Sequence, residues 1–255
     1  RQQLYRPAWR AAAPGRSAPY SIGIDKIAPL LGEFHARHPE VRVEMLLSNE
    51  PMDLIGGEVD VALRLGNLPD SNLIARKLGV LYTQVFAANS YIARHGEPLH
   101  PDDLQYHRTF AMTKHRQGHS YSWSLNDGNG AREFAINPIL VANDPSALKG
   151  ALLCGEGLLL SADVMVKPFV EHGLVQRVLA GWTGGEYELN AVFPRGHVQS
   201  PKVRAFVDFL LERLNLEIDY MSAHCPLMKA QAGQEQDAEH DARHDGKRIL
   251  EEVLS

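Results

Sequence analysis

The sequence has few cysteines, no excess of basic charge and no long apolar segment, and each shortage excludes a class of protein. The two cysteines among its 255 residues, Cys154 and Cys225, are far apart and form no CxxC pair, so we expect no disulfide framework and a reducing, cytoplasmic location. A formal net charge of −5 argues against a chain that binds nucleic acid through a basic surface. No apolar run approaches the roughly 18 residues of a membrane-spanning helix, so we expect no membrane partner.

The sequence also lacks the short motifs that hold a nucleophile, a phosphate or a metal ion. It contains neither a GxSxG nucleophile elbow nor a glycine-rich phosphate loop of either common pattern. Its twelve histidines suggest metal binding, but no cysteine or carboxylate completes a four-ligand set, so solvated surface histidines are the favoured interpretation. The pairs with helical spacing are His35 and His38, His115 and His119, and His240 and His244. We therefore expect no cofactor, no metal and no catalysis.

Cys154 raises the question of a redox sensor. It lies in GALLCGEG, beside Leu152 and Leu153, on the apolar face of a predicted helix. A sensor needs an exposed thiolate and a resolving partner, and the pattern gives neither. The sequence predicts a buried, inert thiol.

The two ends of the chain differ in composition from the middle. Residues 1–16 are basic and contain Pro7, Pro14 and Gly15, which is typical of a linker. They hold no apolar segment of the kind found in a secretion signal, so we expect no such signal. Residues 215–255 are polar and poor in aliphatic side chains, which predicts a disordered tail.

Strands and helices alternate through the middle of the chain. Residues 41–47 and 59–65 show the two-residue period of strands, whereas 27–38 has helical spacing and ends at Pro39. Residues 144–155 predict a helix with Asp144 as N-cap, Pro145 in the first turn and Gly155 after the end. Further predicted elements are strands at 73–79, 80–89, 158–160 and 187–194 and around Trp123 and Phe134, a hairpin turn at 126–130, and helices at 52–55, 90–96, 163–173 and 200–214.

This alternation predicts an α/β fold of mixed, mostly parallel sheets flanked by helices. Residues 98–142 have a different sequence pattern from the residues before them. Later in the chain, one strand and one helix return to the earlier pattern. We therefore expect two Rossmann-like lobes joined by two crossing strands, with lobe I formed by 17–85 and 190–214 and lobe II by 86–189. Ligands of such folds bind at the carboxyl ends of the strands, which here means between the lobes.

The stretch GGEVDVALRLGNLPDSNLIARKLG, residues 56–79, predicts a strand that ends in a turn at this crevice. Gly66, and in part Asn67, tolerates φ values that other residues avoid, so backbone can approach a ligand closely there. Arg64 is a candidate charge anchor for a ligand. The alternative is a structural ion pair with Asp60 or a neighbour, which we favour because the alternation places Arg64 opposite the apolar residues.

Motifs in a fixed order resemble the effector-binding regulatory domain of LysR-type transcriptional regulators. DLIGGEVDVALRLGNLPDSNLIARKLG is the most specific of them. Each motif alone is mostly core packing and turns, and the ordered set, covering about Ser17 to Leu214, carries the resemblance. The other pieces are SAPYSIGIDKIAPLLGEFHARHPEVRVEM, SYIARHGEPLHPDDLQYH, Trp123, NDPSALKGALLCGEGLLL and SPKVRAFVDFLLERL.

The resemblance implies a fold of the type 2 periplasmic-binding-protein kind, with a small-molecule effector, a small organic or aromatic acid, between the lobes. It also implies a homodimer or higher homo-oligomer that pairs side by side through 27–38 and 41–47. DNA binding would reside in an upstream winged helix-turn-helix absent from this chain, and 1–16 would be a linker remnant. The family has an apolar strand just before Ser17, whereas AAAPGR here predicts a shortened or replaced first strand.

Within this resemblance, both lobes contribute candidate contacts to the effector. The loop 17–23 offers hydroxyl groups and the unpaired N–H groups of a helix start, which suit an anion, although capping is the alternative role of its serines. The opposite lobe offers a threonine and a helix start, and the second crossing strand offers an apolar wall. The candidate ligand-binding residues are Ser17, Ser21, Ser48, Arg64, Gly66, Asn67, Thr113, Asn143, Asp144 and Phe193.

Three functions compete at this point. The leading hypothesis is a ligand-sensing regulatory domain that makes and breaks no bond. The second is a solute-binding protein of the same fold that serves a transporter, which the lack of a visible secretion signal disfavours. The third is an enzyme on this two-lobed fold, such as a porphobilinogen-deaminase-like transferase, which would need a reactive cysteine or lysine in the cleft.

Overall fold

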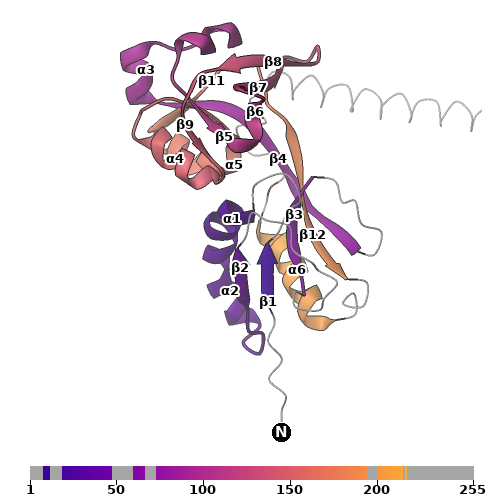
Figure 1. The fold of residues 1–255 in the computed structure, drawn as a ribbon. Helices are drawn as coiled ribbons and strands as arrows, with labels where there is room; N and C mark the ends of the chain where they lie inside the picture. Colours follow the sequence, from indigo (N-terminus) through magenta and orange to yellow (C-terminus); the bar gives the residue numbers. More distant parts are fainter. Residues whose placement is uncertain are drawn as a thin grey trace, which may run out of the picture.

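The computed structural model describes residues 8–11, 19–47, 60–66, 73–194, 200–214 and 216. The predicted helix at 52–55, the tail beyond Leu216 and three candidate ligand-binding residues (Ser17, Ser48 and Asn67) lie outside the described residues. The described chain forms two lobes of sheet and helix, and two strands run between them (Figure 1). The predicted α/β fold with two lobes and two crossing strands is confirmed, whereas the lobe boundaries stay a prediction.

One sheet continues from lobe I into lobe II through β4, a strand of 16 residues at Leu73–Ala88. Its first part, up to Tyr82, pairs antiparallel with β12, and from Thr83 onward it pairs antiparallel with β10 and β11. β5 lies parallel to both β10 and β9. The strands in spatial order are β3 (Ala62–Leu65), β12 (Glu186–Pro194), β4, β10 (Leu158–Ala162), β5 (Thr109–Met112) and β9 (Pro138–Ala142), with β11 (Val175–Val178) also on β4.

The sequence pattern predicts two strands at 73–79 and 80–89, and the structure joins them into β4. Leu189 of β12 lies opposite Gly79 while Asn190 lies opposite Lys77, so Leu78 is an extra residue on the β4 side. Such a bulge bends a strand and increases its twist. Gly79 follows the extra residue, at a position where a Cβ would lie 2.5 Å from the Cβ of Leu216.

The two crossing strands are held together where they leave lobe II. The Thr83 hydroxyl donates to the Gly185 carbonyl (2.9 Å) and accepts from the Gly185 N–H (2.7 Å), and the Gly184 N–H donates to the Thr83 carbonyl (2.7 Å). A Cβ on Gly184 would lie 2.2 Å from the Thr83 hydroxyl oxygen, so only glycine fits there. These bonds fix the junction at which the lobes meet.

The helical segment of lobe I is irregular around Pro29. It runs as α1 (Pro19–Ile22), the π-helical η1 (Gly23–Ile27), the 3₁₀-helical η2 (Ala28–Leu30) and α2 (Leu31–Arg37). Proline has no N–H and clashes with the preceding turn, so a regular α-helix cannot pass through it. The predicted helix at 27–38 is thus part of a longer segment that begins before Ser21.

The first strand of lobe I lies within the segment 1–16, which the sequence interpretation assigned to a linker. β1 (Ala8–Ala11) pairs parallel with β2 (Glu44–Leu47), from Ala8 opposite Glu44 to Ala11 opposite Leu47. Pro14 and Gly15 follow β1 and so remove no donor from it. The first strand is therefore short and lies earlier in the chain than Ser17 suggested.

The core of lobe I lies between this helical segment, the sheet and α6 (Pro201–Arg213). Phe34 is fully buried, and its ring centroid is 4.8 Å from that of Phe206 and 5.2 Å from that of Phe209. Ser200 holds the N-cap position of α6 without a capping bond from its side chain. The apolar stripe of α6 is buried throughout: Val203, Phe206, Val207, Leu210 and Leu214.

Lobe II carries a separate antiparallel sheet of β6 (Arg116–Gln117), β7 (Ser120–Asn126) and β8 (Ala131–Ile136). The predicted turn at 126–130 joins β7 to β8, and the predicted aromatic pair, Trp123 and Phe134, lies directly across the hairpin. Trp123 is fully buried, so this hairpin is anchored in the core of lobe II. The helical elements of this lobe are α3 (Asn89–His95), η3 (Pro101–Tyr106), η4 (Thr113–His115), α4 (Pro145–Leu153) and α5 (Asp163–Glu171).

Both ends of α4 agree with the sequence prediction, with Gly155 after the last turn at a φ of +74°, whereas the predicted burial of Cys154 is wrong. Asp144 is the N-cap, and its side chain accepts a 2.8 Å hydrogen bond from the Ser146 N–H, with Pro145 in the first turn. Cys154 is exposed at the C-terminal end of this helix rather than buried. The apolar residue that faces the core there is Leu152. Successive side chains of an α-helix are rotated by about 100° around its axis, so the neighbours of Leu152 point in other directions.

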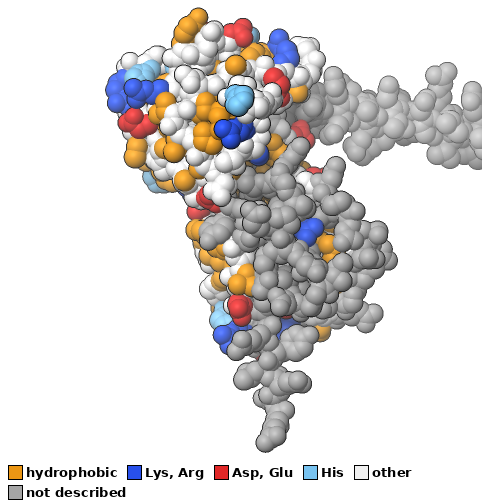
Figure 2. All heavy atoms as spheres, in the orientation of Figure 1, with side chains coloured by type: hydrophobic (Ala, Val, Ile, Leu, Met, Phe, Trp, Pro, Cys, Tyr) orange, Lys and Arg blue, Asp and Glu red, His pale blue; other side chains and the backbone are white. Residues whose placement is uncertain are grey.

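The visible surface is mixed in character. Figure 2 shows acidic, basic and apolar side chains interspersed over the described part of lobe II that faces the viewer. None of the helices in the described ranges combines the length and apolarity that crossing a bilayer would require.

Candidate functional site

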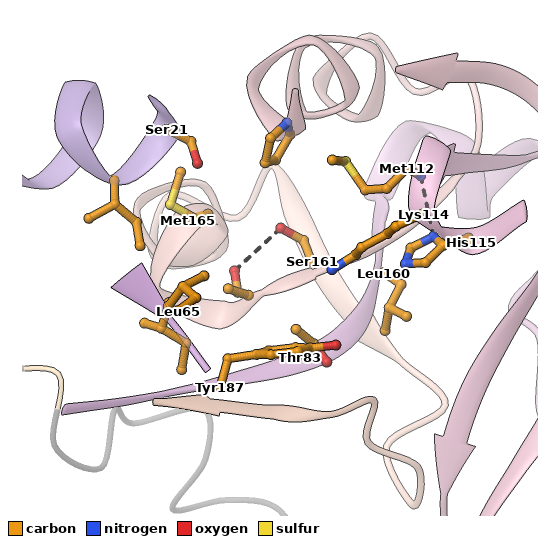
Figure 3. Close-up of a pocket in the computed structure, with 14 residues that line it drawn as sticks. Ser21, Leu65, Thr83, Met112, Lys114, His115, Leu160, Ser161, Met165 and Tyr187 are labelled. Atoms are coloured by element: carbon orange, nitrogen blue, oxygen red, sulfur yellow. Dashed lines mark hydrogen bonds between the residues drawn. The ribbon is translucent and has the colours of Figure 1, made fainter. Parts of the chain in front are cut away.

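A cavity of about 70 Å³ lies where the two lobes meet, and both lobes line it (Figure 3). Its walls come from α1 and β3 on lobe I, from β10, η4 and the helix starts on lobe II, and from the crossing strands. The lining residues are Ser21, Ile22, Leu65, Leu81, Thr83, Met112, Lys114, His115, Pro145, Leu160, Ser161, Ala162, Met165 and Tyr187.

On lobe I the cavity is lined by α1 and by the end of β3. Ser21 lies within α1 and is only 1% exposed, so its hydroxyl is desolvated at the cavity wall. The sequence interpretation placed Ser21 in a loop before the helix; the structure places it inside the helix, next to Ile22. Leu65, the last residue of β3, adds an apolar surface.

On lobe II the turn after β5 brings a cation and an imidazole to the cavity. Lys114 and His115 belong to η4, which follows β5 directly. The Lys114 ammonium lies 5.0 Å from the centroid of the Tyr187 ring, a cation–π distance, and Figure 3 shows Lys114 reaching across the cavity. Ser161 on β10 adds a nearly buried hydroxyl, whose hydrogen bond to the Ala162 carbonyl is long, at 3.4 Å.

His115 is held as a neutral imidazole. Burial, and to a lesser degree the positive charge of Lys114, lowers the pKa of His115 from 6.5 to about 4, against the opposing effect of the negative charge of Glu133. Its Nδ1 accepts a 3.3 Å hydrogen bond from the Met112 N–H. A neutral imidazole that accepts at Nδ1 carries its proton at Nε2, so His115 offers a donor from its other nitrogen.

The charge of the cavity favours an anion. Among the described residues that line it, Lys114 carries a full positive charge and none is Asp or Glu. Ser21, His115 and Ser161 supply further donors, while leucine, isoleucine and methionine side chains form most of the rest. A few polar groups set in an apolar wall are the usual design of a small-molecule site.

An ion pair joins the lobes beside the cavity. The Lys149 ammonium on α4 of lobe II contacts the Asp25 carboxylate on η1 of lobe I, and both side chains are largely shielded from water, with 17% and 26% exposed. Partial burial weakens screening by solvent and salt, so this pair is stronger than an exposed one. The pair therefore stabilises the arrangement in which the lobes are in contact.

We expect Lys149→Met to loosen this arrangement. The change keeps the aliphatic stem and removes the charge, so it should lower the free energy of unfolding by about 1 kcal/mol and increase the radius of gyration measured by small-angle X-ray scattering. Arg132→Met is the matched control, because Arg132 pairs with Asp127 within one hairpin of lobe II. Identical scattering from Lys149→Met, Arg132→Met and the unchanged chain would contradict an interlobe role for the pair.

Of the seven described candidate residues from the sequence, one lines the cavity and six do not. Ser21 lines it. Arg64 is 7% exposed on β3 but is not in the lining, and Gly66 follows the end of that strand with a φ of +81°. Ligand contact by these residues stays a prediction. The others outside the lining are Thr113, Asn143, Asp144 and Phe193.

Three lining residues lie next in sequence to a candidate residue. Leu65, Lys114 and Pro145 line the cavity, and each directly follows a candidate that does not. For Leu65, at the end of β3, the reason is that successive side chains of a strand point to opposite faces. Lys114 in η4 and Pro145 at the start of α4 differ in direction from their neighbours because side chains turn by about 100–120° per residue in such helices.

Phe193 is misplaced for a different reason. The sequence interpretation placed it near the second crossing, but the crossing occurs at the start of β12, where Tyr187 lines the cavity. Phe193 lies opposite Ile74 and packs into the core of lobe I. The sequence signal for Tyr187 is its position as the aromatic residue at the polar end of YELNAVFP.

Comparison with known proteins relates this architecture to one family. The family described as LysR substrate binding domain matches residues 17–215. An HTH-type transcriptional regulator of Xanthomonas campestris pv. campestris (strain 8004) is 62% identical over 247 residues, which are 94% of this chain and 72% of that protein. The HTH-type transcriptional regulator CrgA of Neisseria meningitidis serogroup B is 32% identical over 189 residues, 74% of this chain and 62% of its own length. The chain thus spans less than two thirds of CrgA.

Solved structures give the same relationship. The regulatory domain of CrgA from Neisseria meningitidis superposes with a TM-score of 0.69 at 28% identity, covering 82% of this chain and 100% of that chain. The full-length virulence activator AphB of Vibrio cholerae superposes with a TM-score of 0.67 at 26% identity, covering 81% of this chain and 68% of that chain.

Proposed function

Because the chain belongs to the family of LysR substrate-binding domains, we propose that it is the effector-sensing part of a DNA-binding transcriptional regulator and that the interlobe cavity is its effector site. The observation that carries this proposal is the lining of the cavity, which combines Lys114 with neutral donors on an apolar wall and draws on both lobes. A ligand that touches both lobes changes their relative free energies, as a sensor requires.

The chemistry of the lining favours a small organic anion with an apolar body. The carboxylate would be placed near Lys114 and the Nε2–H of His115, where a charge-assisted hydrogen bond forms to an oxyanion. The leucine, isoleucine and methionine side chains would bury the carbon skeleton. A small organic or aromatic acid fits this description.

The mechanism is a change of population rather than a reaction. An acid that binds the closed arrangement of lobes more tightly than the open one shifts the equilibrium by its difference in affinity. The Asp25–Lys149 pair biases the same equilibrium before any effector binds. In the whole regulator, two copies would pair side by side, and an upstream winged helix-turn-helix would bind DNA in the cytoplasm. The names of the relatives give no support to a transporter role or to catalysis.

A thermal-shift screen of the purified chain against small organic acids tests the proposal. An acid that binds only the folded state raises its melting midpoint in proportion to RT ln(1 + [L]/Kd). We expect selective shifts with a subset of acids and none with the corresponding alcohols. Uniform indifference to all acids would contradict the proposed site.

Ser21→Ala is expected to lower the affinity for the best acid of that screen about fivefold, because it removes one buried hydroxyl from the cavity wall. Isothermal titration calorimetry measures the change. Ser90→Ala removes a hydroxyl from exposed α3 and serves as the control. An equal change in both variants, or in neither, would reject this placement of the site.

A further inference from the structure

A second and larger hollow adjoins the interlobe cavity. It is a groove of about 850 Å³ between the β7–β8 hairpin of lobe II and the start of β12. Its lining is mostly polar, in contrast to the inner cavity. The lining residues are Tyr82, Lys114, His115, Gln117, Ser122, Ser124, Asn126, Gly128, Ala131, Glu133, Leu160, Thr183, Gly184, Gly185, Glu186 and Tyr187.

The groove and the inner cavity share one wall. Lys114, His115, Leu160 and Tyr187 line both hollows. The Lys114 ammonium over the Tyr187 ring therefore lies at the boundary between them. A ligand whose carboxylate meets Lys114 and His115 from the inner side can extend past this pair into the groove.

The inner cavity is smaller than most small-molecule sites. Its volume of about 70 Å³ is well below the roughly 300–1,000 Å³ of small-molecule sites, whereas the groove, at about 850 Å³, falls within that range. Together the two hollows hold a ligand with one end in each.

The outer groove adds negative charge that the inner cavity lacks. Glu133 on β8 and Glu186 at the start of β12 line the groove but not the cavity. The Glu133 carboxylate is oriented by the Ser122 hydroxyl (2.5 Å) and the Gln117 amide (3.2 Å), and both of these groups donate to Oε2. These two bonds fix the orientation of the Glu133 carboxylate, and its Oε1 can accept a hydrogen bond from a ligand.

We propose that the effector is a carboxylic acid that carries an ammonium group at its far end, with the carboxylate at Lys114 and His115 and the ammonium at Glu133 in the outer groove. This inference rests on the proposed function and specifies its ligand class. Complementary charges at both ends give specificity, because an acid without the ammonium leaves the oriented carboxylate of Glu133 unpaired.

A matched pair of probes tests the inference. Benzoate and 4-(aminomethyl)benzoate share the carboxylate and the ring and differ by the ammonium group. Isothermal titration of the 255-residue chain at low ionic strength should show about tenfold tighter binding of 4-(aminomethyl)benzoate. In Glu133→Gln the ratio of the two affinities should fall to about one, while Glu171→Gln, which removes a carboxylate from the end of α5, should keep the tenfold ratio.

The outcomes separate this inference from the function on which it rests. Equal affinities in the unchanged chain, a ratio that survives Glu133→Gln, or binding of neither probe would each overturn the zwitterionic ligand. The effector site itself is decided by the wider acid screen and by Ser21→Ala, whose result does not depend on the ammonium group. A tenfold ratio that only Glu133→Gln abolishes would establish the outer groove as part of the site.

Discussion

Lowering the pH from 7 to 4 is expected to remove about 3 kcal/mol from the free energy of unfolding through His115 alone. Burial, and secondarily the charge of Lys114, lowers the pKa of His115 from 6.5 to about 4. Between these two values the unfolded chain binds a proton at this residue and the folded chain does not. The contribution is therefore fully present above about pH 6.5 and is lost as the pH falls toward 4.

Urea unfolding of the unchanged chain and of His115→Gln at several pH values measures this effect. Between pH 7 and pH 4, the unfolding free energy of the unchanged chain should fall by about 3 kcal/mol relative to that of His115→Gln, because glutamine has no proton to gain. His119→Gln is the matched control, since His119 is exposed in the turn between β6 and β7. Parallel pH profiles for all three chains would show that His115 is not buried as a neutral base.

Lys114→Glu is expected to lower the affinity for the best acid of the screen about 100-fold, the largest loss predicted for any single residue of the cavity. The change replaces the attraction between an ammonium and the bound carboxylate by repulsion. Two unit charges 4 Å apart interact with about 4 kcal/mol at an effective dielectric constant of 20, and the exposure of Lys114 to solvent reduces that figure. The loss should shrink as the salt concentration rises.

The control for Lys114→Glu is Arg204→Glu, which makes the same change in net charge on the exposed face of α6 in lobe I. Isothermal titration of both variants separates a local effect from a general electrostatic one. A similar loss in the two variants would mean that net charge, rather than contact with Lys114, governs binding. Retained affinity in Lys114→Glu would remove the central anion-binding group from the site.

The fold could be predicted because its determinants are local in the sequence. The Asp144 cap, the Pro145 start and the helix at 200–214 each follow from a local pattern of about a dozen residues, and the structure confirms them. The crossing strands follow from the order of the elements. The exposed position of Cys154 was missed because a helix end does not hold the regular face of its middle.

The site could be predicted only to the nearest segment. Ser21 is the one candidate in the described ranges that lines the cavity, whereas Leu65, Lys114 and Pro145 each lie one residue past a candidate. Which side chain faces the other lobe depends on how the lobes meet, and that is set by contacts distant in sequence. The Thr83–Gly185 bonds join residues 102 positions apart, and the Asp25–Lys149 pair joins residues 124 apart. No local pattern encodes such a junction.

Hydrogen exchange of the chain with and without the best acid of the screen tests most directly whether a small anion binds between the lobes. Bound acid should slow amide exchange together in α1 and η1 of lobe I and in the segments 109–116 and 158–166 of lobe II, because one ligand touches both walls of the cavity. Protection confined to a single lobe, or located away from these segments, would contradict the account.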